Sequence, residues 1–167
     1  MKSIAQIDKA GLLRSLRDRV DADLAALVRR QLDIQEGATH AESRSEHAKD
    51  TRATEQSYLA RGLANRVVEA RRVAGALANS ELPRVAPDDP IAVLCLVAVR
   101  EAMEDQDQIW WLVPGPAGVE ISQDDLRVQT VTPAAPLGRA LIGLRRGDEG
   151  SLASPSGERT FEIVEIA

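Results

Sequence analysis

Carboxylates concentrate in residues 33–50, and their chemistry is the easiest to assign in this chain. The acidic residues of the stretch outnumber its two basic ones and are Asp33, Glu36, Glu42, Glu46 and Asp50. Glu42 and Glu46 are four residues apart, so on a helix they share a face and repel each other by roughly a few tenths of a kcal/mol. Carboxylate oxygens are the ligands that Mg²⁺ prefers, and an approaching cation relieves such repulsion. The pattern predicts a surface that attracts a divalent cation.

Two other residue types invite a chemical role and do not support one. His40 and His47 flank the glutamates, but their spacing matches no structural zinc site, and catalytic zinc needs three protein ligands in fixed geometry. We interpret both histidines as exposed polar residues. Cys95 is the single cysteine and lies in an apolar run. We interpret it as a small buried hydrophobe, neither a nucleophile nor a disulfide partner.

The carboxylates lie between two segments that are predicted to be amphipathic helices. Apolar residues recur at three- and four-residue steps over residues 12–32 and again over residues 58–77, with charged residues between them. Two such stripes bury each other most simply in an antiparallel coiled-coil hairpin. Arms of about 28–38 residues would extend roughly 40–55 Å. Residues 1–82 are therefore predicted to form a hairpin.

The turn between the two helices is predicted near residues 36–46. No proline occurs before Pro83, so the break is assigned to Gly37, which readily adopts a left-handed C-cap. Thr39 or Ser43 would then cap the second helix. This arrangement makes the acidic stretch the tip of the hairpin.

The second half of the chain changes to a period typical of strands. Prolines in residues 83–90 form a linker, and residues 91–167 are predicted to be a small α+β domain. One short helix is expected from Pro136 to about Leu144, with proline at its start. Strands are expected near 91–101, 108–113, 118–122, 126–132, 149–153 and 159–166.

Charge is distributed unevenly along a chain of net charge −5. Residues 1–82 hold 14 basic and 12 acidic residues, whereas residues 83–167 hold 7 and 14. Such an acidic domain is a poor match for a phosphate backbone, so sequence-specific DNA binding is not expected. No apolar run is long enough to span a membrane and the start of the chain is not a signal sequence, so a cytoplasmic protein is expected.

The C-terminal segment carries a pattern that resembles a known family. It reads Pro-Leu-Gly-Arg-Ala-Leu-Ile-Gly at 136–143, Gly-Asp at 147–148, Pro-Ser-Gly at 155–157 and Phe-Glu-Ile at 161–163. This resembles the end of the GreA/GreB transcription factors, whose domains are a coiled-coil hairpin followed by an FKBP-like α+β fold. The resemblance implies the same two domains in this chain.

The predicted tip resembles the same family in a divergent form. Family cleavage factors carry Gly-Asp-x-x-Glu-Asn-Ala where the second helix begins, and residues 42–48 here read Glu-Ser-Arg-Ser-Glu-His-Ala. Glu46 falls on the family's glutamate and His47 on its asparagine. Ser43 replaces the aspartate, and Glu42 replaces the glycine before it.

The resemblance implies that RNA polymerase is the partner. In the family the hairpin enters the secondary channel, and its tip carboxylates help to hold the second Mg²⁺ of the polymerase, so that a backtracked transcript is cleaved. Glu46, assisted by Glu42, would meet that metal here. The chain would bind no cofactor of its own and would not itself be an enzyme. It would be a monomer, touching nascent RNA only indirectly within the elongation complex.

Five further residues are implied to contact the polymerase, three at the tip and two in the C-terminal domain. At the tip, Ser43 and His47 take family positions, and Arg44 is suited to pair with acidic channel walls. In the C-terminal domain, the family uses the loop before the short helix to grip the rim of the channel. Pro136 keeps its place there, but Ala134 and Ala135 replace the family's polar pair. Arg139 lies on the short helix and is expected to bridge to an acidic strand.

Three alternatives remain open at this point. The altered tip is compatible with a factor that occupies the channel and inhibits or modulates the polymerase without stimulating cleavage. The FKBP-like domain raises a peptidyl-prolyl isomerase or chaperone, although fold alone does not license an activity. An isomerase pocket needs an aromatic lining, for which the domain offers only Trp110, Trp111 and Phe161. A dimeric coiled coil would instead self-associate through the N-terminal stripe.

Overall fold

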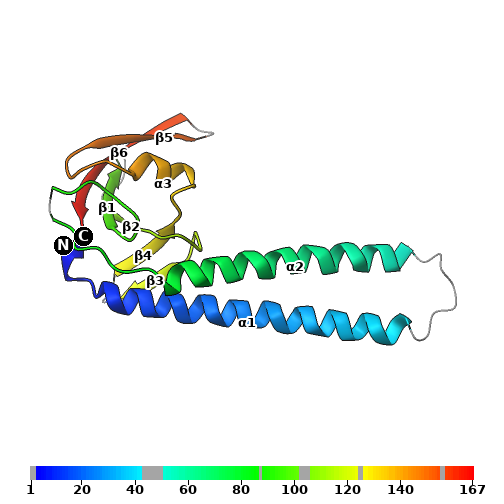
Figure 1. The fold of residues 1–167 in the computed structure, drawn as a ribbon. Coiled ribbons are helices and arrows are strands. Elements are labelled where there is room, and N and C mark those ends of the chain that lie inside the picture. Colours follow the sequence, from blue (N-terminus) through cyan, green and yellow to red (C-terminus); the bar gives the residue numbers. More distant parts are fainter. Residues whose placement is uncertain (1–2, 43–50, 87, 102–105, 124–125, 155–156) are drawn as a thin grey trace. The chain divides into compact units, whose positions relative to one another are not determined.

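The chain folds into two compact units in the computed structural model, which describes residues 3–42, 51–86, 88–101, 106–123, 126–154 and 157–167 (Figure 1). The hairpin unit is Arg17–Ala78, and the C-terminal unit joins Met1–Leu16 to Asn79–Ala167. The predicted hairpin had included residues 1–16 and ended at residue 82. In the structure the first sixteen residues group with the C-terminal unit instead.

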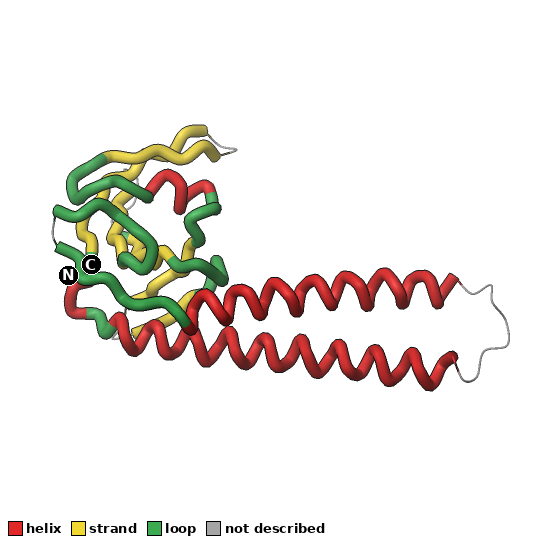
Figure 2. The backbone as a smooth tube through the Cα atoms, viewed as in Figure 1, coloured by secondary structure: helices red, strands yellow, loops and turns green. Residues whose placement is uncertain are grey.

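Two long helices make up the hairpin, as the apolar periodicity predicts. Helix α1 spans Lys9–Glu42 and helix α2 spans Thr51–Ala78, and they run antiparallel (Figures 1 and 2). Asp8 caps the start of α1, because its Oδ1 accepts a hydrogen bond from the Gly11 amide at 2.9 Å. None of the helices in the described ranges combines enough length with enough apolar character to cross a membrane.

The predicted helix break at Gly37 is wrong. Helix α1 continues through Gly37 and Thr39 to Glu42, so Thr39 does not cap the second helix. Glycine in a helix interior costs about 1 kcal/mol relative to alanine. That is too little to end a helix whose neighbouring residues favour it. The predicted cap at Ser43 lies outside the described residues.

The base of the hairpin is joined by one arginine. Arg17 on α1 donates from Nε to the carbonyl oxygen of Leu77 at 2.9 Å and from Nη2 to that of Ala78 at 3.3 Å. These carbonyls belong to the last turn of α2 and have no partner within their own helix. A cation there is also favoured by the negative end of the helix dipole. Arg17 therefore sets which turn of α1 lies beside the end of α2.

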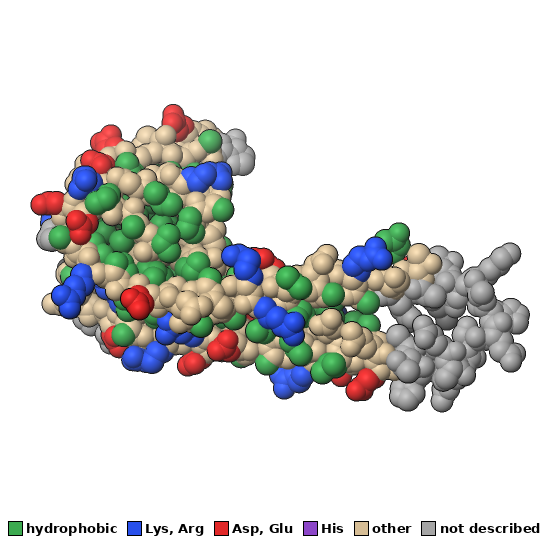
Figure 3. Space-filling model, in the orientation of Figure 1, with side chains coloured by type: hydrophobic (Ala, Val, Ile, Leu, Met, Phe, Trp, Pro, Cys, Tyr) green, Lys and Arg blue, Asp and Glu red, His purple; other side chains and the backbone are tan. Residues whose placement is uncertain are grey.

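Burial along the hairpin decreases away from this base. The buried apolar residues of the unit, among those that the structure describes, are Val20, Leu63, Val67 and Leu77. No described residue of α1 beyond Val20 is buried, and Leu32 is 52% exposed. On α2, Tyr58 and Leu59 are each 68% exposed. The periodic apolar stripe predicted from the sequence therefore extends beyond the part of the hairpin in which its side chains are buried. On the hairpin surface, apolar side chains are exposed among charged ones (Figure 3).

A six-stranded sheet forms the centre of the C-terminal unit, in agreement with the predicted α+β class. Its order is β3-β4-β2-β1-β6-β5, and every neighbouring pair is antiparallel except β2 with β4. The strands are β1 Leu96–Glu101, β2 Gln108–Leu112, β3 Glu120–Gln123, β4 Leu126–Val131, β5 Glu149–Ser154 and β6 Gly157–Ile166.

Two predicted boundaries in this unit are too wide. The strand expected from residue 91 begins at Leu96, because residues 93 and 94 form a turn in which Leu94 has φ of 71°. Ile91 and Cys95 are buried there without belonging to a strand. Helix α3, Pro136–Leu141, ends before the expected Leu144, since the next residue leaves helical geometry.

Both faces of the sheet are covered. Leu141 of α3 packs in a core cluster with Val97, Val99 and Ile163. Alternate strand residues point to the opposite face, where Leu96 is also fully buried. A 3₁₀ helix, η1 Ile4–Gln6, lies against β1 and β6. Further buried residues of the N-terminal segment are Ile7, Leu12, Leu13 and Leu16.

Replacing Arg17 by alanine should weaken the base of the hairpin. We expect the free energy of unfolding to fall by about 1 kcal/mol, because two helix-end carbonyls lose a charged donor. Urea denaturation followed by helical circular dichroism measures this. Arg19→Ala, at an exposed neighbouring position, is the control. Equal losses in the two variants would show that Arg17 has no special role.

Replacing Gly37 by alanine should stabilise the hairpin. An added Cβ at Gly37 meets no atom within 4 Å, and alanine is favoured over glycine in a helix interior by roughly 0.5–1 kcal/mol. The melting temperature of the helical signal should therefore rise. A fall would indicate a left-handed cap at Gly37, as the sequence pattern alone suggests.

Candidate functional site

The acidic tip lies where the two long helices end. Helix α1 ends at Glu42 and helix α2 begins at Thr51, so Glu42 is the last residue of its helix. The other predicted tip residues, Ser43, Arg44, Glu46 and His47, lie outside the described residues. Their predicted roles, and the shared face expected for Glu42 and Glu46, stay predictions.

The loop before α3 is built by short local contacts. The Ala135 amide donates to the Thr132 carbonyl at 3.0 Å, and Ala135 caps the helix without a side-chain hydrogen bond. Pro136 follows as the first helical residue and is exposed. Proline suits this position because it has no amide hydrogen to leave unpaired. The predicted contact residue Pro136 is therefore presented at the surface on a defined turn.

Arg139 stabilises this loop instead of bridging to an acidic strand. Its Nη1 donates to the carbonyl oxygen of Ala134, and its backbone amide donates to that of Ala135 at 2.9 Å. The expected bridge to an acidic strand is not among the contacts that the structure gives for Arg139. The guanidinium remains exposed, so it closes the turn while leaving charge at the surface beside Pro136.

Gly138 allows α3 to approach the same loop. A Cβ at this position would lie 2.0 Å from the Thr132 carbonyl oxygen and 2.9 Å from its carbon. No side chain fits at that distance from a backbone atom. The glycine is thus required by close approach, and the loop from Thr132 to Pro136 depends on it.

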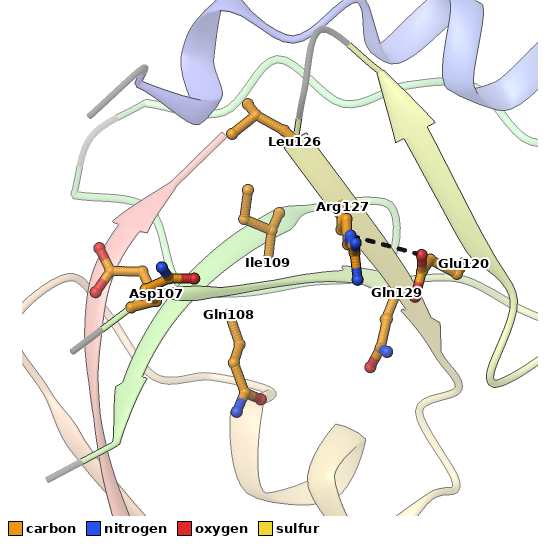
Figure 4. Close-up of a pocket in the computed structure, with 8 residues that line it drawn as sticks. Asp107, Gln108, Ile109, Glu120, Leu126, Arg127 and Gln129 are labelled. Carbon is orange, nitrogen blue, oxygen red and sulfur yellow. Dashed lines mark ion pairs between the residues drawn. The ribbon is translucent and has the colours of Figure 1, made fainter. Parts of the chain in front are cut away.

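A hollow of about 650 Å³ opens on the sheet at the starts of β2 and β4 (Figure 4). Arg127 points toward Glu120 across it, with Nε and Oε1 4.0 Å apart. The lining residues are Gln106, Asp107, Gln108, Ile109, Glu120, Leu126, Arg127 and Gln129. No aromatic side chain is among these residues, so the hollow lacks the lining that a prolyl isomerase pocket needs.

The carboxylate of Asp107 at the edge of this hollow is already bound. Arg100 donates from Nε to its Oδ1 at 2.7 Å and from Nη2 to its Oδ2 at 3.1 Å. These hydrogen bonds, and then the carboxylate charge, raise the pKa of the Arg100 guanidinium above its usual value. The side chain of Asp107 is only 4% exposed. Its charge is therefore neutralised within the fold and is not offered to a ligand.

Metal ligands do not gather in the described part of the chain. No group of three or more His, Cys, Asp or Glu residues there is arranged to hold a metal ion. Cys95 is free and buried, as expected for a small hydrophobe. Trp111 is also buried and donates from Nε1 to the Leu94 carbonyl at 3.3 Å, while half-buried Trp110 packs against the core cluster.

The residues around the hollow were not predicted as a site. Arg127 and Gln129 alternate with the buried Val128 on β4, and this alternation puts both on one face of the sheet. That much is readable from the sequence. Glu120 meets them through the antiparallel pairing of β3 with β4. Gln108 meets them through the parallel pairing of β2 with β4, which no local pattern reveals.

The C-terminal unit matches a family model. Residues 87–167 match the model described as Transcription elongation factor, GreA/GreB, C-term. The GreA transcription elongation factor of Halorhodospira halophila is 30% identical over 98 residues, covering 58% of this chain and 59% of that protein. That of Syntrophus aciditrophicus is 35% identical over 91 residues, covering 54% and 53%. The matches thus span a little over half the length of these relatives.

Solved structures of related proteins superpose loosely. Gfh1 of Thermus aquaticus covers 89% of this chain and 92% of its own, with 19% identity and a TM-score of 0.39. The GreA/GreB elongation factor of Nitrosomonas europaea covers 59% and 78%, with 25% identity and a TM-score of 0.38.

Replacing Gly138 by alanine should disrupt the loop before α3. Because the new Cβ would overlap the Thr132 carbonyl, we expect a loss of about 1–3 kcal/mol in the free energy of unfolding. Urea denaturation followed by tryptophan fluorescence reports it, since both tryptophans lie in β2. Gly62→Ala on α2 is the control, because nothing lies within 4 Å of its Cβ. A Gly138→Ala variant as stable as the wild type would contradict the close approach of α3 to Thr132.

Proposed function

We propose that this chain, whose residues 87–167 match the GreA/GreB C-terminal family model, regulates transcription elongation by binding RNA polymerase. The observation that carries the proposal is the order of parts. A two-helix hairpin, whose arms are Arg17–Glu42 and Thr51–Ala78, is followed by a domain that matches this family. At about 1.5 Å per residue, arms of this length reach roughly 40 Å.

The hairpin would act as a probe for the secondary channel of the polymerase. A narrow pore excludes a globular surface but admits two helices side by side. Helix α1 ends at Glu42, so that residue and Glu46 would be carried at the leading end. Their carboxylates would help a polymerase-held Mg²⁺ to orient the attacking water. In this mechanism the chain contributes charge and position, and the polymerase performs the hydrolysis.

The C-terminal unit would bind at the rim of that channel. Pro136 is exposed at the start of α3, and Arg139 and Gly138 hold the loop that presents it. A fixed loop loses little conformational entropy on binding. Because Ala134 and Ala135 have no polar side-chain groups, binding of this loop to the polymerase would depend more on shape complementarity than on hydrogen bonds.

A factor that occupies the channel without stimulating cleavage is the second candidate. The observation that favours it is Ser43, which stands where family cleavage factors carry an aspartate. A hydroxyl carries no charge and is a weaker ligand for Mg²⁺ than a carboxylate. Binding to the polymerase is common to both candidates, and they differ only in the effect on the metal.

A transcript-cleavage assay on a backtracked elongation complex tests the proposal. We expect the wild-type protein to bind the polymerase and to stimulate little or modest cleavage. Glu46→Ala should lower the stimulated rate by at least about tenfold, because a metal-directed carboxylate is lost. Ser43→Asp should raise the rate, because it restores the second carboxylate. Binding of both variants is measured in parallel as a control for folding.

The outcomes separate the two candidates. Vigorous cleavage that Glu46→Ala leaves unchanged would refute the metal role of that residue. Occupancy of the channel with no cleavage by the wild type would select the second candidate. Failure of the wild type to bind the polymerase at all would overturn both.

A further inference from the structure

The hairpin unit divides by burial into an outer and a basal segment. The outer segment comprises residues 28–37 of α1 and 54–62 of α2, and the basal segment comprises residues 17–27 and 66–78. Every outer side chain whose burial the structure describes is exposed or half-buried. The buried residues of the basal segment are Val20, Val67 and Leu77, and Leu63 lies at the boundary with 7% exposure. The burial that stabilises the hairpin is therefore concentrated in the basal segment.

The outer helices leave their large apolar side chains in contact with water. Leu32 is 52% exposed, and Tyr58 and Leu59 are each 68% exposed. The half-buried residues of the outer segment, among those described, are Val28, Gln31, Ile34 and Ala60. One of these four is polar, and another is an alanine, which has only a methyl group to bury. Because most helical stability in proteins comes from packing of an apolar face, the outer helices are weakly stabilised.

Two glycines weaken the same outer segment further. Gly37 lies in α1 and Gly62 in α2, and an added Cβ at either position would meet nothing within 4 Å. Neither glycine is therefore required by close approach, in contrast to Gly138. Glycine lowers helix stability because it loses more backbone entropy on folding than any other residue. Each outer helix thus contains a residue that opposes the helix and that no packing contact explains.

We propose that the outer segment of the hairpin opens on its own while the basal segment stays closed. Opening means that the backbone hydrogen bonds of the outer helices break and re-form repeatedly in the native protein. The basal segment stays closed because it holds the buried side chains and because Arg17 donates to the carbonyls of Leu77 and Ala78. The hairpin therefore consists of two units of stability, and its outer end changes shape without disturbing its base.

Amide hydrogen exchange in the free, full-length protein tests this opening. Each rate is measured by NMR and divided by the rate of an unstructured peptide of the same sequence. We expect the hydrogen-bonded amides of the outer segment to exchange at similar corrected rates, about 100-fold or more faster than those of the basal segment. Equal protection in the two segments would overturn the proposal. A gradual change along each helix, with no step near Leu63, would indicate fraying of helix ends and would also overturn it.

Matched glycine variants separate local opening from unfolding of the whole hairpin. The double variant Gly37→Ala, Gly62→Ala should slow exchange of the outer amides by roughly tenfold, because alanine stabilises the closed helices. Gly75→Ala is the control, because its Cβ also meets nothing within 4 Å but lies in the basal segment. It should slow basal exchange by roughly threefold to fivefold and leave outer exchange unchanged. If Gly75→Ala slows outer and basal exchange equally, the hairpin opens as one unit and the proposal fails.

The role of this opening in binding rests on the proposed function and is measured separately. In a complex with RNA polymerase, the walls of the channel would surround the outer segment and favour its closed form. Exchange of the outer amides should then slow by about tenfold or more relative to the free protein. Unchanged outer exchange in a complex that forms would contradict entry of the hairpin into the channel, and so the proposed function. The rates of the free protein are measured without the polymerase, so they decide separately whether the outer segment opens.

Discussion

The apolar stripe of α1 is the constraint on which both units depend. Its first part, with Leu12 and Leu16, is buried in the C-terminal unit, and its next part, at Val20, is buried in the hairpin unit. Farther along, Leu32 is more than half exposed. Burying a leucine contributes roughly 1.5–3 kcal/mol, so the stabilising free energy is concentrated at the base of the hairpin. Because isolated helices are marginal in water, the arms rely on this base.

Close backbone approach is the corresponding constraint around α3. Gly138 lets the helix lie against Thr132, and the Arg139 guanidinium closes the turn onto the Ala134 carbonyl. Neither contact uses a side chain of residue 134 or 135, because both acceptors are backbone carbonyls. The loop therefore keeps its shape and places Pro136 at the start of the helix with alanine at both preceding positions.

Periodicity predicted the two long helices and most strands, because burial on one face imposes a repeat of 3.6 or 2 residues. It failed where the deciding energy is small or nonlocal. Glycine at position 37 destabilises the helix by about 1 kcal/mol relative to alanine, which is less than the stabilisation from the neighbouring helical residues. Residues 91–95 are as apolar as a strand, yet Leu94 has φ of 71°. Residues 1–16 group with the C-terminal unit through contacts with β1 and β6. The sequence does not reveal this, because the apolar stripe of these residues continues into the stripe of the hairpin without interruption. The roles of Glu42 and Glu46 stay predictions that rest on family position, since spacing alone predicts no more than attraction of a cation.

Apolar and polar contacts have different roles at the base of the hairpin. Five buried aliphatic side chains from residues 3–16 together contribute roughly 7–15 kcal/mol, at roughly 1.5–3 kcal/mol each. Each hydrogen-bonded contact adds only about 1 kcal/mol net, or somewhat more where one partner is charged. Yet the polar contacts, through Asp8, Arg17 and Glu165, are the directional ones. Removing one of them would change the alignment of the base more than it would unfold the protein.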